Sequence, residues 1–207
     1  MKLVLATGNP GKVTSAQYFV GDVDFTNEDL DLVEKGTTVY EISRNKVLQA
    51  YSFLRANGDV GALVEDSAFY TPNDLDISPG PFIKRFLREH RADEGGLGPF
   101  LRRVKEKGHP IKAYFRMVVT YFDCRLEHPI QFESRVMGPL IGERRGESKP
   151  FVKSPLAYIF QFDGQPGDES THKTIAEMTE EEYKHYDDQT NWEEFGKWFG
   201  RNRWHVK

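Results

Sequence analysis

The stretch Leu5 to Lys12 combines residue types that could receive phosphate. It reads Leu-Ala-Thr-Gly-Asn-Pro-Gly-Lys and follows an apolar opening, so a short buried strand should enter a tight turn that ends in a lysine. Such a turn aims backbone N–H groups, a hydroxyl, an amide and an ammonium at one point, and a helix starting behind it adds partial positive charge. The spacing differs from that of a Walker P-loop. We predict a phosphate-binding turn; an ordinary strand-to-helix turn is the alternative.

Three acidic side chains could bind a divalent cation. Glu65 and Asp66 follow Gly61–Val64, an apolar run expected to be a central strand, and Glu41 lies early in a predicted helix. Carboxylates at the carboxyl end of such a strand project into the crevice where α/β proteins bind ligands. Two adjacent acids repel each other unless a cation lies between them or one is protonated, and Mg²⁺ prefers such oxygen ligands. The alternative is that Glu65 and Asp66 cap a turn.

Basic residues accompany these acids. Lys46 lies five residues after Glu41 in the predicted helix, and five residues turn about 140° beyond a full circle, so the two do not share a stripe. Lys84 and Arg85 follow a turn rich in proline and glycine that leads into another predicted helix, and they could also meet an anion. The alternative for all these cations is a solvent-exposed surface position.

Alternating strands and helices must position these side chains. This order favours an α/β sheet, and without a linker rich in Pro, Gly or Ser we expect residues 1–207 to form a single domain. The apolar spacing predicts strands over 2–6, 23–26, 61–64, 113–124, 129–136 and 158–162, and helices over 13–20, from 39 to a cap at Asn57-Gly58, and over 82–90, 99–107, 180–186 and 192–204. Loops are predicted over 73–81, 138–153 and 165–171.

The composition fits a soluble globular protein with a core rich in aromatic rings. The chain has 207 residues, 38% of them hydrophobic and 29% charged, with 15 Phe and nine Tyr. Its net charge of -4 argues against a nucleic-acid polymer as partner, because such binders usually carry a basic face. The large aromatic residues of the last predicted helix should pack on the body of the protein, although a subunit contact is the alternative.

Several other classes of protein are disfavoured. Cys124 is the one cysteine, so the chain forms no internal disulfide and no Cys-based zinc site, and its apolar surroundings suggest a small core residue. The six histidines show no metal-ligand spacing. Polar Thr7, Asn9 and Lys12 interrupt any signal peptide, and no apolar run is long enough to span a bilayer. We therefore expect a cytoplasmic protein that is not bound to a membrane.

Together, these motifs resemble the inosine/xanthosine triphosphate pyrophosphatase family, which hydrolyses aberrant purine nucleoside triphosphates. The resemblance rests on four motifs in the family's order, within roughly the first ninety residues. They are the phosphate-binding turn at Leu5–Lys12, a Glu-x-x-x-x-Lys helix start at Glu41–Lys46, an acidic segment at Glu65-Asp66-Ser67, and a Pro-Gly-x-Phe helix start at Pro79–Phe82.

The resemblance implies an elongated α/β fold, with a mixed, strongly twisted central sheet, flanking helices, and two lobes with a cleft between them. It implies a homodimer that uses Mg²⁺ to hydrolyse a nucleoside triphosphate, such as (d)ITP or XTP, to the monophosphate plus pyrophosphate. By similarity, the phosphates are bound by Thr7, Asn9, Lys12 and Lys46. Glu41 and Asp66 would hold Mg²⁺, and Asp66 or Glu65 would orient or deprotonate the attacking water.

The chain departs from the family where the base is read. The family's Phe-Gly-Tyr/Trp-Asp-Pro segment is absent before Phe160, and its Ser-His-Arg is absent after Met178, although Thr171-His172-Lys173 resembles it out of order. Acceptors such as Asp187 or Asp188 would favour a base that presents amino groups over one that presents only carbonyls. The base contacts are predicted to come from Tyr158, Phe82, Lys84, Asp187 and Asp188.

Two other functions remain open on these residues. The same scaffold could act on a modified or pyrimidine nucleotide, since its second half is altered. It could also be a nucleotide sensor without activity, although a mere binder need not keep both acids beside the phosphates. Turnover of a panel of nucleoside triphosphates separates the three possibilities.

Overall fold

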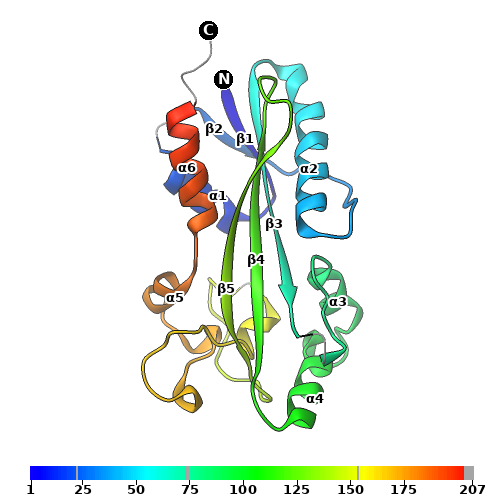
Figure 1. Ribbon diagram of the computed structural model, residues 1–207, viewed down its shortest axis with the longest axis vertical. Helices are drawn as coiled ribbons and strands as arrows, with labels where there is room; N and C mark the ends of the chain where they lie inside the picture. Colours follow the sequence, from blue (N-terminus) through cyan, green and yellow to red (C-terminus); the bar gives the residue numbers. More distant parts are fainter. Residues whose placement is uncertain (22, 73–74, 153, 203–207) are drawn as a thin grey trace. The chain divides into compact units, whose positions relative to one another are not determined.

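The central feature of the protein is a twisted sheet with strand order β2-β1-β3-β4-β5, seen in a computed structural model that describes residues 1–21, 23–72, 75–152 and 154–202 (Figure 1). β1 (Lys2–Ala6) runs parallel to β2 (Phe25–Glu28) and to β3 (Val60–Tyr70). β4 (Ile111–Phe122) and β5 (Ile130–Leu140) complete the sheet. The α/β class with flanking helices is therefore confirmed.

The helices form close to where apolar spacing predicted them. They are α1 (Pro10–Val20), α2 (Val39–Leu54), α3 (Ile83–Glu89), α4 (Gly98–Lys107), α5 (Glu180–Tyr186) and α6 (Thr190–Asn202). α1 begins three residues before its predicted start, because Asn9 caps it and a proline occupies its first turn, where a missing N–H costs nothing. No helix among the described residues is long and apolar enough to cross a membrane.

The chain forms two compact units. The first unit comprises Met1–Ser67, Met117–Ser134 and Gln189–Lys207, and the second comprises Ala68–Arg116 and Arg135–Asp188. β3, β4 and β5 each contribute residues to both units. Two units agree with the two lobes expected from the family resemblance, whereas a single domain spanning the whole chain stays a prediction.

In the first unit, alternate residues of each strand pack on opposite faces of the sheet. Leu5 and Leu63 are buried in a cluster with residues of α1 and α6. Val4 and Val64 are buried in a second cluster, with residues of α2. Because side chains alternate along a strand, the residue after Val64 faces α1 and the next faces α2. This alternation decides where the acidic pair of β3 points.

The last helix packs within the first unit, as its aromatic spacing indicated. Trp192, Phe195 and Phe199 are buried and join Tyr121 of β4 in one cluster. The ring centroids of Tyr121 and Phe195 are 5.7 Å apart. The core interpretation of this helix is therefore confirmed; Trp204, which was expected to belong to it, lies outside the described residues.

The core of the second unit is also aromatic. Phe69 of β3 and Phe115 of β4 have ring centroids 4.7 Å apart. Phe69 also meets Phe100 of α4 at 5.9 Å and Phe160 at 6.0 Å. Phe69, Phe100 and Phe160 are fully buried, so these rings hold α4 and the segment around Phe160 against the sheet.

Three expectations about local structure are wrong. β3 does not end at Val64 but runs to Tyr70, and β5 runs to Leu140, because pairing with neighbouring strands carries both past the apolar runs that predicted them. The predicted strand 158–162 is absent: Pro155–Tyr158 forms a 3-10 helix capped by the Ser154 side chain, and only single bridges follow.

Cys124 is likewise not a core residue. Its thiol is free and the residue is exposed. β4 ends at Phe122, so Cys124 already belongs to the turn that leads towards β5. The strand that suggested burial of Cys124 therefore ends two residues before it.

Candidate active site

The turn between β1 and α1 is held by its own polar side chains. Thr7 Oγ1 accepts a hydrogen bond from the Asn9 backbone N–H at 3.1 Å, and Asn9 Oδ1 accepts one from the Gly11 N–H at 2.9 Å. Both side chains act as acceptors in these bonds, so the hydroxyl proton of Thr7 and the amide protons of Asn9 can be donated to an anion. The N-terminus of α1 adds partial positive charge at the same turn.

Lys12 and Glu65, two predicted site residues, meet at this turn. In the sheet Leu5 lies opposite Leu63, so Glu65 comes level with the turn that follows β1. The Lys12 ammonium donates to the backbone oxygen of Glu65 and lies 3.6 Å from its Oε1. Their side chains are only 14% and 9% exposed, which places this cation and carboxylate in a sheltered position.

Lys46 lies between two carboxylates. Its Nζ is 2.7 Å from Asp66 Oδ1 and 2.8 Å from Glu34 Oε1. The side chains of Lys46 and Asp66 are 15% and 16% exposed, so Lys46 is not a solvated surface lysine. Burial alone would lower the pKa of Lys46, but the charges and hydrogen bonds of Asp66 and Glu34 outweigh it and raise the pKa.

Glu65 and Asp66 do not form the shared cation site that their adjacency suggested. Because neighbouring residues of a strand face opposite sides, Glu65 points towards Lys12 of α1 and Asp66 towards Lys46 of α2. Each carboxylate is thus balanced by its own lysine. The expectation that a cation between the two relieves their repulsion is wrong for this geometry.

Asp66 retains an oxygen that could bind a cation. Its Oδ2 is buried and has no hydrogen-bond partner among the described residues. A buried carboxylate oxygen without a partner is costly, and a hard cation such as Mg²⁺ would satisfy it. In the described part of the chain no group of three or more His, Cys, Asp or Glu residues is placed to hold a metal, so substrate oxygens and water would have to complete its ligands.

Glu34 was missed by the sequence analysis. It lies in the segment before α2, which has no periodic pattern. Two side chains of α2 hold that segment: Gln49 exchanges hydrogen bonds with both backbone groups of Val33, and Asn45 donates to the Lys35 oxygen at 2.8 Å. Asn45 and Gln49 are polar and lie one helical turn apart, with Asn45 directly before Lys46. These two residues were the only sequence signal that the preceding loop folds back against α2.

Glu41 caps the N-terminus of α2. Its Oε2 accepts hydrogen bonds from the Thr37 N–H, the Thr37 hydroxyl and the Thr38 N–H, and Thr38 Oγ1 in turn accepts from the Glu41 N–H. This is a capping box at the start of α2. The Thr37 backbone bond is the largest cause that lowers the pKa of Glu41. Among the described residues these hydrogen bonds join Glu41 to Thr37 and Thr38 and not to Asp66 or Lys46, so its metal role stays a prediction.

The residues predicted to contact the base lie on separate elements of the second unit. Phe82 precedes α3 and its ring lies 4.9 Å from the Arg85 guanidinium, while Lys84 is exposed on α3 itself. Tyr158 ends a 3-10 helix, and the guanidinium of Arg144 lies 4.0 Å from the centre of its ring. One face of Tyr158 is therefore covered by a cation of the protein.

Asp187 and Asp188 follow α5. Asp187 ends that helix, where its N–H donates to the Tyr183 oxygen. Asp188 Oδ2 accepts a hydrogen bond from the Arg135 N–H of β5 at 3.2 Å. Asp188 thus ties the end of α5 to the sheet, a task that competes with the predicted contact to an amino group of the base.

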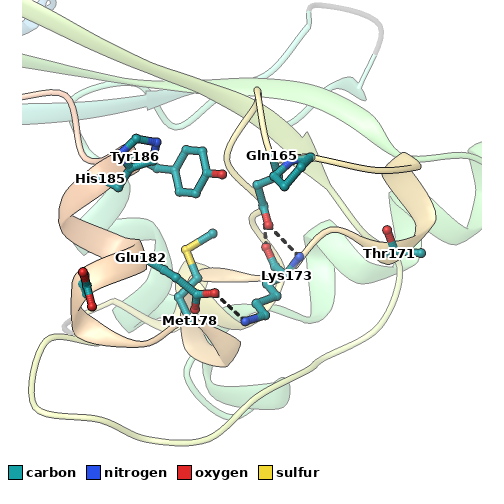
Figure 2. A pocket seen from close by; sticks show the side chains of 9 residues that line it. Gln165, Thr171, Lys173, Met178, Glu182, His185 and Tyr186 are labelled. Atoms are coloured by element: carbon teal, nitrogen blue, oxygen red, sulfur yellow. Dashed lines mark hydrogen bonds and ion pairs between the residues drawn. The ribbon is translucent and has the colours of Figure 1, made fainter.

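A pocket of about 410 Å³ lies beside α5 in the second unit (Figure 2). The ion pair between Lys173 and Glu182, 2.6 Å long, borders it. None of the residues predicted from the sequence lines it. Its lining residues are Gln165, Pro166, Thr171, Lys173, Met178, Glu181, Glu182, His185 and Tyr186.

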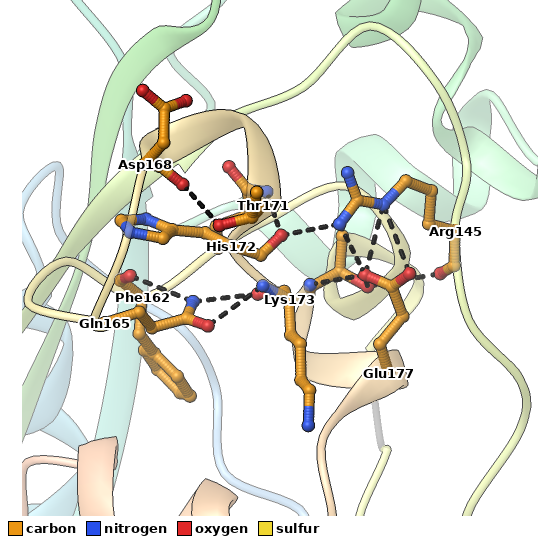
Figure 3. Close-up of polar contacts among 10 residues, drawn as sticks. Arg145, Phe162, Gln165, Asp168, Thr171, His172, Lys173 and Glu177 are labelled. Carbon is orange, nitrogen blue, oxygen red and sulfur yellow. Dashed lines mark hydrogen bonds and ion pairs between the residues drawn. The ribbon is translucent and has the colours of Figure 1, made fainter.

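The out-of-order Thr171-His172-Lys173 triplet lies in a loop and stabilises it through hydrogen bonds (Figure 3). The His172 oxygen accepts from Arg145 at 2.5 Å and from Gln161 at 2.6 Å. Gln165 bonds both backbone groups of Lys173. His172 itself is buried, so the triplet anchors its loop and does not present three side chains to a ligand.

Comparisons with known proteins agree with the sequence resemblance. The sequence model of the Ham1 family matches residues 3–190. Inosine triphosphate pyrophosphatase 1 of Trypanosoma cruzi is 34% identical over 186 residues, which cover 87% of this chain and 83% of that protein. A dITP/XTP pyrophosphatase of Thermus thermophilus is 31% identical over 194 residues, 90% of this chain and 85% of that protein.

Solved structures share the fold. A HAM1 protein from Coxiella burnetii superimposes with a TM-score of 0.76 at 20% identity, covering 97% of this chain and 99% of that one. The Ham1 protein of Staphylococcus aureus gives a TM-score of 0.75 at 20% identity, covering 98% of this chain and all of that one. The expected fold and family are therefore confirmed.

Proposed function

This chain belongs to the Ham1 family, and we propose that it hydrolyses a purine nucleoside triphosphate of the inosine or xanthosine type to the monophosphate plus pyrophosphate. The named relatives are inosine triphosphate and dITP/XTP pyrophosphatases, which makes it a nucleoside triphosphate pyrophosphatase.

One observation carries the proposal: Lys46 is held between Asp66 and Glu34, in the same unit as the turn that carries Thr7, Asn9 and Lys12. A lysine ammonium has three N–H donors. Lys46 can therefore keep both carboxylates and still donate to a phosphate oxygen. Fixed cations of this kind stabilise the charge that develops on phosphoryl oxygens.

Mg²⁺ is proposed as the cofactor, held by Asp66 and by Glu34 or the predicted Glu41. The buried, unpartnered Oδ2 of Asp66 supports this assignment, as does the presence of Glu34 and Asp66 around one ammonium. When bound, the ion would neutralise phosphate charge and polarise the bond that breaks. Glu65, or Asp66 itself, is proposed to orient the attacking water and to accept its proton.

Turnover of a panel of nucleoside triphosphates with Mg²⁺ tests the function. We expect ITP, dITP and XTP to yield monophosphate and pyrophosphate, and Asp66→Asn to remove most of that activity. Asp163→Asn, at an exposed carboxylate of the second unit, is the matched control and should behave as the wild-type protein. Tight binding without turnover would favour a sensor, and turnover confined to pyrimidines would overturn the purine assignment.

A homodimer is proposed from the family resemblance, and the cytoplasmic location expected from the sequence is kept as a proposal. Light scattering of the purified protein across its working concentration range tests the dimer, and a single monomeric mass throughout that range would contradict it. Fractionation of cells that make the tagged chain tests the compartment.

A further inference from the structure

Two tyrosines and two arginines gather on three neighbouring strands of the second unit. Tyr70 of β3 stacks on Tyr114 of β4, with ring centroids 5.0 Å apart and planes inclined by 20°. The Arg116 guanidinium lies 5.4 Å from the centre of the Tyr70 ring and 5.6 Å from that of Tyr114. Arg135 of β5 lies 6.0 Å from the centre of the Tyr114 ring. We call these four residues the arginine–tyrosine cluster.

The cluster faces away from the core of the second unit. Phe69 precedes Tyr70, and Phe115 lies between Tyr114 and Arg116; both phenylalanines belong to the aromatic core. Alternate residues of a strand point to opposite faces, so the cluster lies on the other face. Its two tyrosines and Arg116 are partly exposed, and its β5 arginine is exposed, so a ligand can reach them.

The cluster presents flat surfaces and hydrogen-bond donors. A guanidinium is planar and has five N–H donors and no acceptor. Burial is the largest cause that raises the pKa of Tyr70, so its phenol stays protonated at neutral pH and can donate as well. Such a surface suits a planar ring that presents carbonyl oxygens. A ring that presents amino groups would place its N–H donors against the N–H and O–H donors of the cluster. Donors on both sides would then be buried without acceptors when the ring binds.

We propose that the arginine–tyrosine cluster binds the purine of the substrate by its carbonyl oxygens and selects oxo-purines over amino-purines. This inference rests on the proposed function. It opposes the earlier hypothesis that Asp187 or Asp188 selects a base with amino groups, and the two make opposite predictions for ITP and ATP. Asp188 already accepts the Arg135 N–H, which supports the cluster over the acids as the site of selection.

Exchange of one arginine tests the inference. Arg116→Gln replaces a group that only donates by an amide that both donates and accepts. The ratio of kcat/KM for ITP to kcat/KM for ATP should fall at least tenfold, and XTP, with two carbonyls, should lose more than ITP. Because the ratio is measured within one variant, it does not depend on how much of the preparation is folded. Arg103→Gln, at a half-buried arginine of α4 that pairs with Glu106, is the matched control and should keep the wild-type ratio.

Two further variants separate the groups within the cluster. Tyr114→Phe keeps the ring and removes the hydroxyl, so a tenfold loss there would assign part of the selection to the phenol. Arg116→Lys keeps the charge but loses the planar fork, and an intermediate ratio is expected; it also serves if the glutamine variant does not fold. An unchanged ratio in every variant, or equal losses for ITP and ATP, would overturn the inference.

Binding of monophosphates separates this inference from the proposed function. Calorimetric titration with IMP, XMP and AMP needs no turnover. If the wild-type protein hydrolyses no nucleoside triphosphate, the proposed function fails, yet tighter binding of IMP and XMP than of AMP, lost in Arg116→Gln, would still support the cluster. If the protein hydrolyses ITP but binds IMP and AMP equally well, the function stands and the cluster has no role in selection.

Discussion

Removal of the Lys46 ammonium should destabilise the first unit measurably. In Lys46→Met the aliphatic stem stays and the charge goes, so Asp66 is left as a carboxylate with neither oxygen paired. Breaking a buried ion pair from one side costs roughly 3–5 kcal/mol. The two side chains keep 15% and 16% exposure, which favours the lower end of that range.

The second partner of Lys46 adds little to this figure. Glu34 is 43% exposed, and an ion pair with such a partner contributes about 0–1 kcal/mol. We therefore expect a loss of about 3 kcal/mol in the free energy of unfolding, a fall in Tm of about 6–12 °C for a chain of this length. Because the pKa of Lys46 is raised on folding, the contribution is complete below pH 10.5 and is lost only as the pH rises through the folded value.

Urea denaturation followed by circular dichroism measures the effect, with Lys184→Met as matched control. Lys184 pairs with Glu180 on the surface of α5, with both side chains more than 60% exposed, so its loss should change stability by less than about 0.5 kcal/mol. The double variant Lys46→Met/Asp66→Asn should recover most of the loss, because no charge remains buried. A cost below about 1 kcal/mol, or strict additivity of the two single changes, would refute the reasoning.

Three other outcomes follow from contacts away from Lys46. Glu41→Gln should leave the urea midpoint unchanged because glutamine preserves a capping box, so a loss of turnover in that variant would reveal a metal role and full turnover would exclude one. Gly138→Ala should destabilise the second unit by at least about 2 kcal/mol in the same assay, since a Cβ there would lie 1.7 Å from the Gln161 backbone oxygen; a smaller effect would contradict this fit. Burial disfavours the ionised form of Glu177, but the hydrogen bonds from Arg145 favour it and the net effect lowers the pKa of Glu177. The ionised carboxylate therefore stabilises the fold above pH 4.5, and this stabilisation is lost as the pH falls below that value. Melting curves from pH 3 to 7 should therefore fall more steeply at the acid end in the wild-type protein than in Glu177→Gln.

Local patterns were sufficient for much of the fold. Helical spacing of apolar residues identified α2 and α6, and the dense β-branched and aromatic run 113–124 identified β4. These signals are reliable because each reports which face of one element is buried. These signals fail at the ends of strands, because pairing with a neighbouring strand sets where a strand stops. β3 continues to Tyr70 beside its other neighbour β4, beyond the end of β1, although its last residues no longer form an apolar run.

The residues of the candidate site likewise fall into those that the sequence predicted and those that it did not. Thr7, Asn9 and Lys12 lie in one short turn, so their spacing alone predicted that they would act together. Glu34 escaped notice because its partner Lys46 is twelve residues away and is reached only when the loop is pinned to α2. No periodicity reports a contact of that kind.

The sequence by itself determined the family and the α/β class, and it located the turn between β1 and α1, because each depends on residues close together in the chain. Only the tertiary structure decided that Glu65 and Asp66 face opposite sides of β3, each with its own lysine. It alone assembled Tyr70, Tyr114, Arg116 and Arg135 from three strands. The physical reason is that strand pairing fixes which distant residues become neighbours, and pleating fixes which face each one shows.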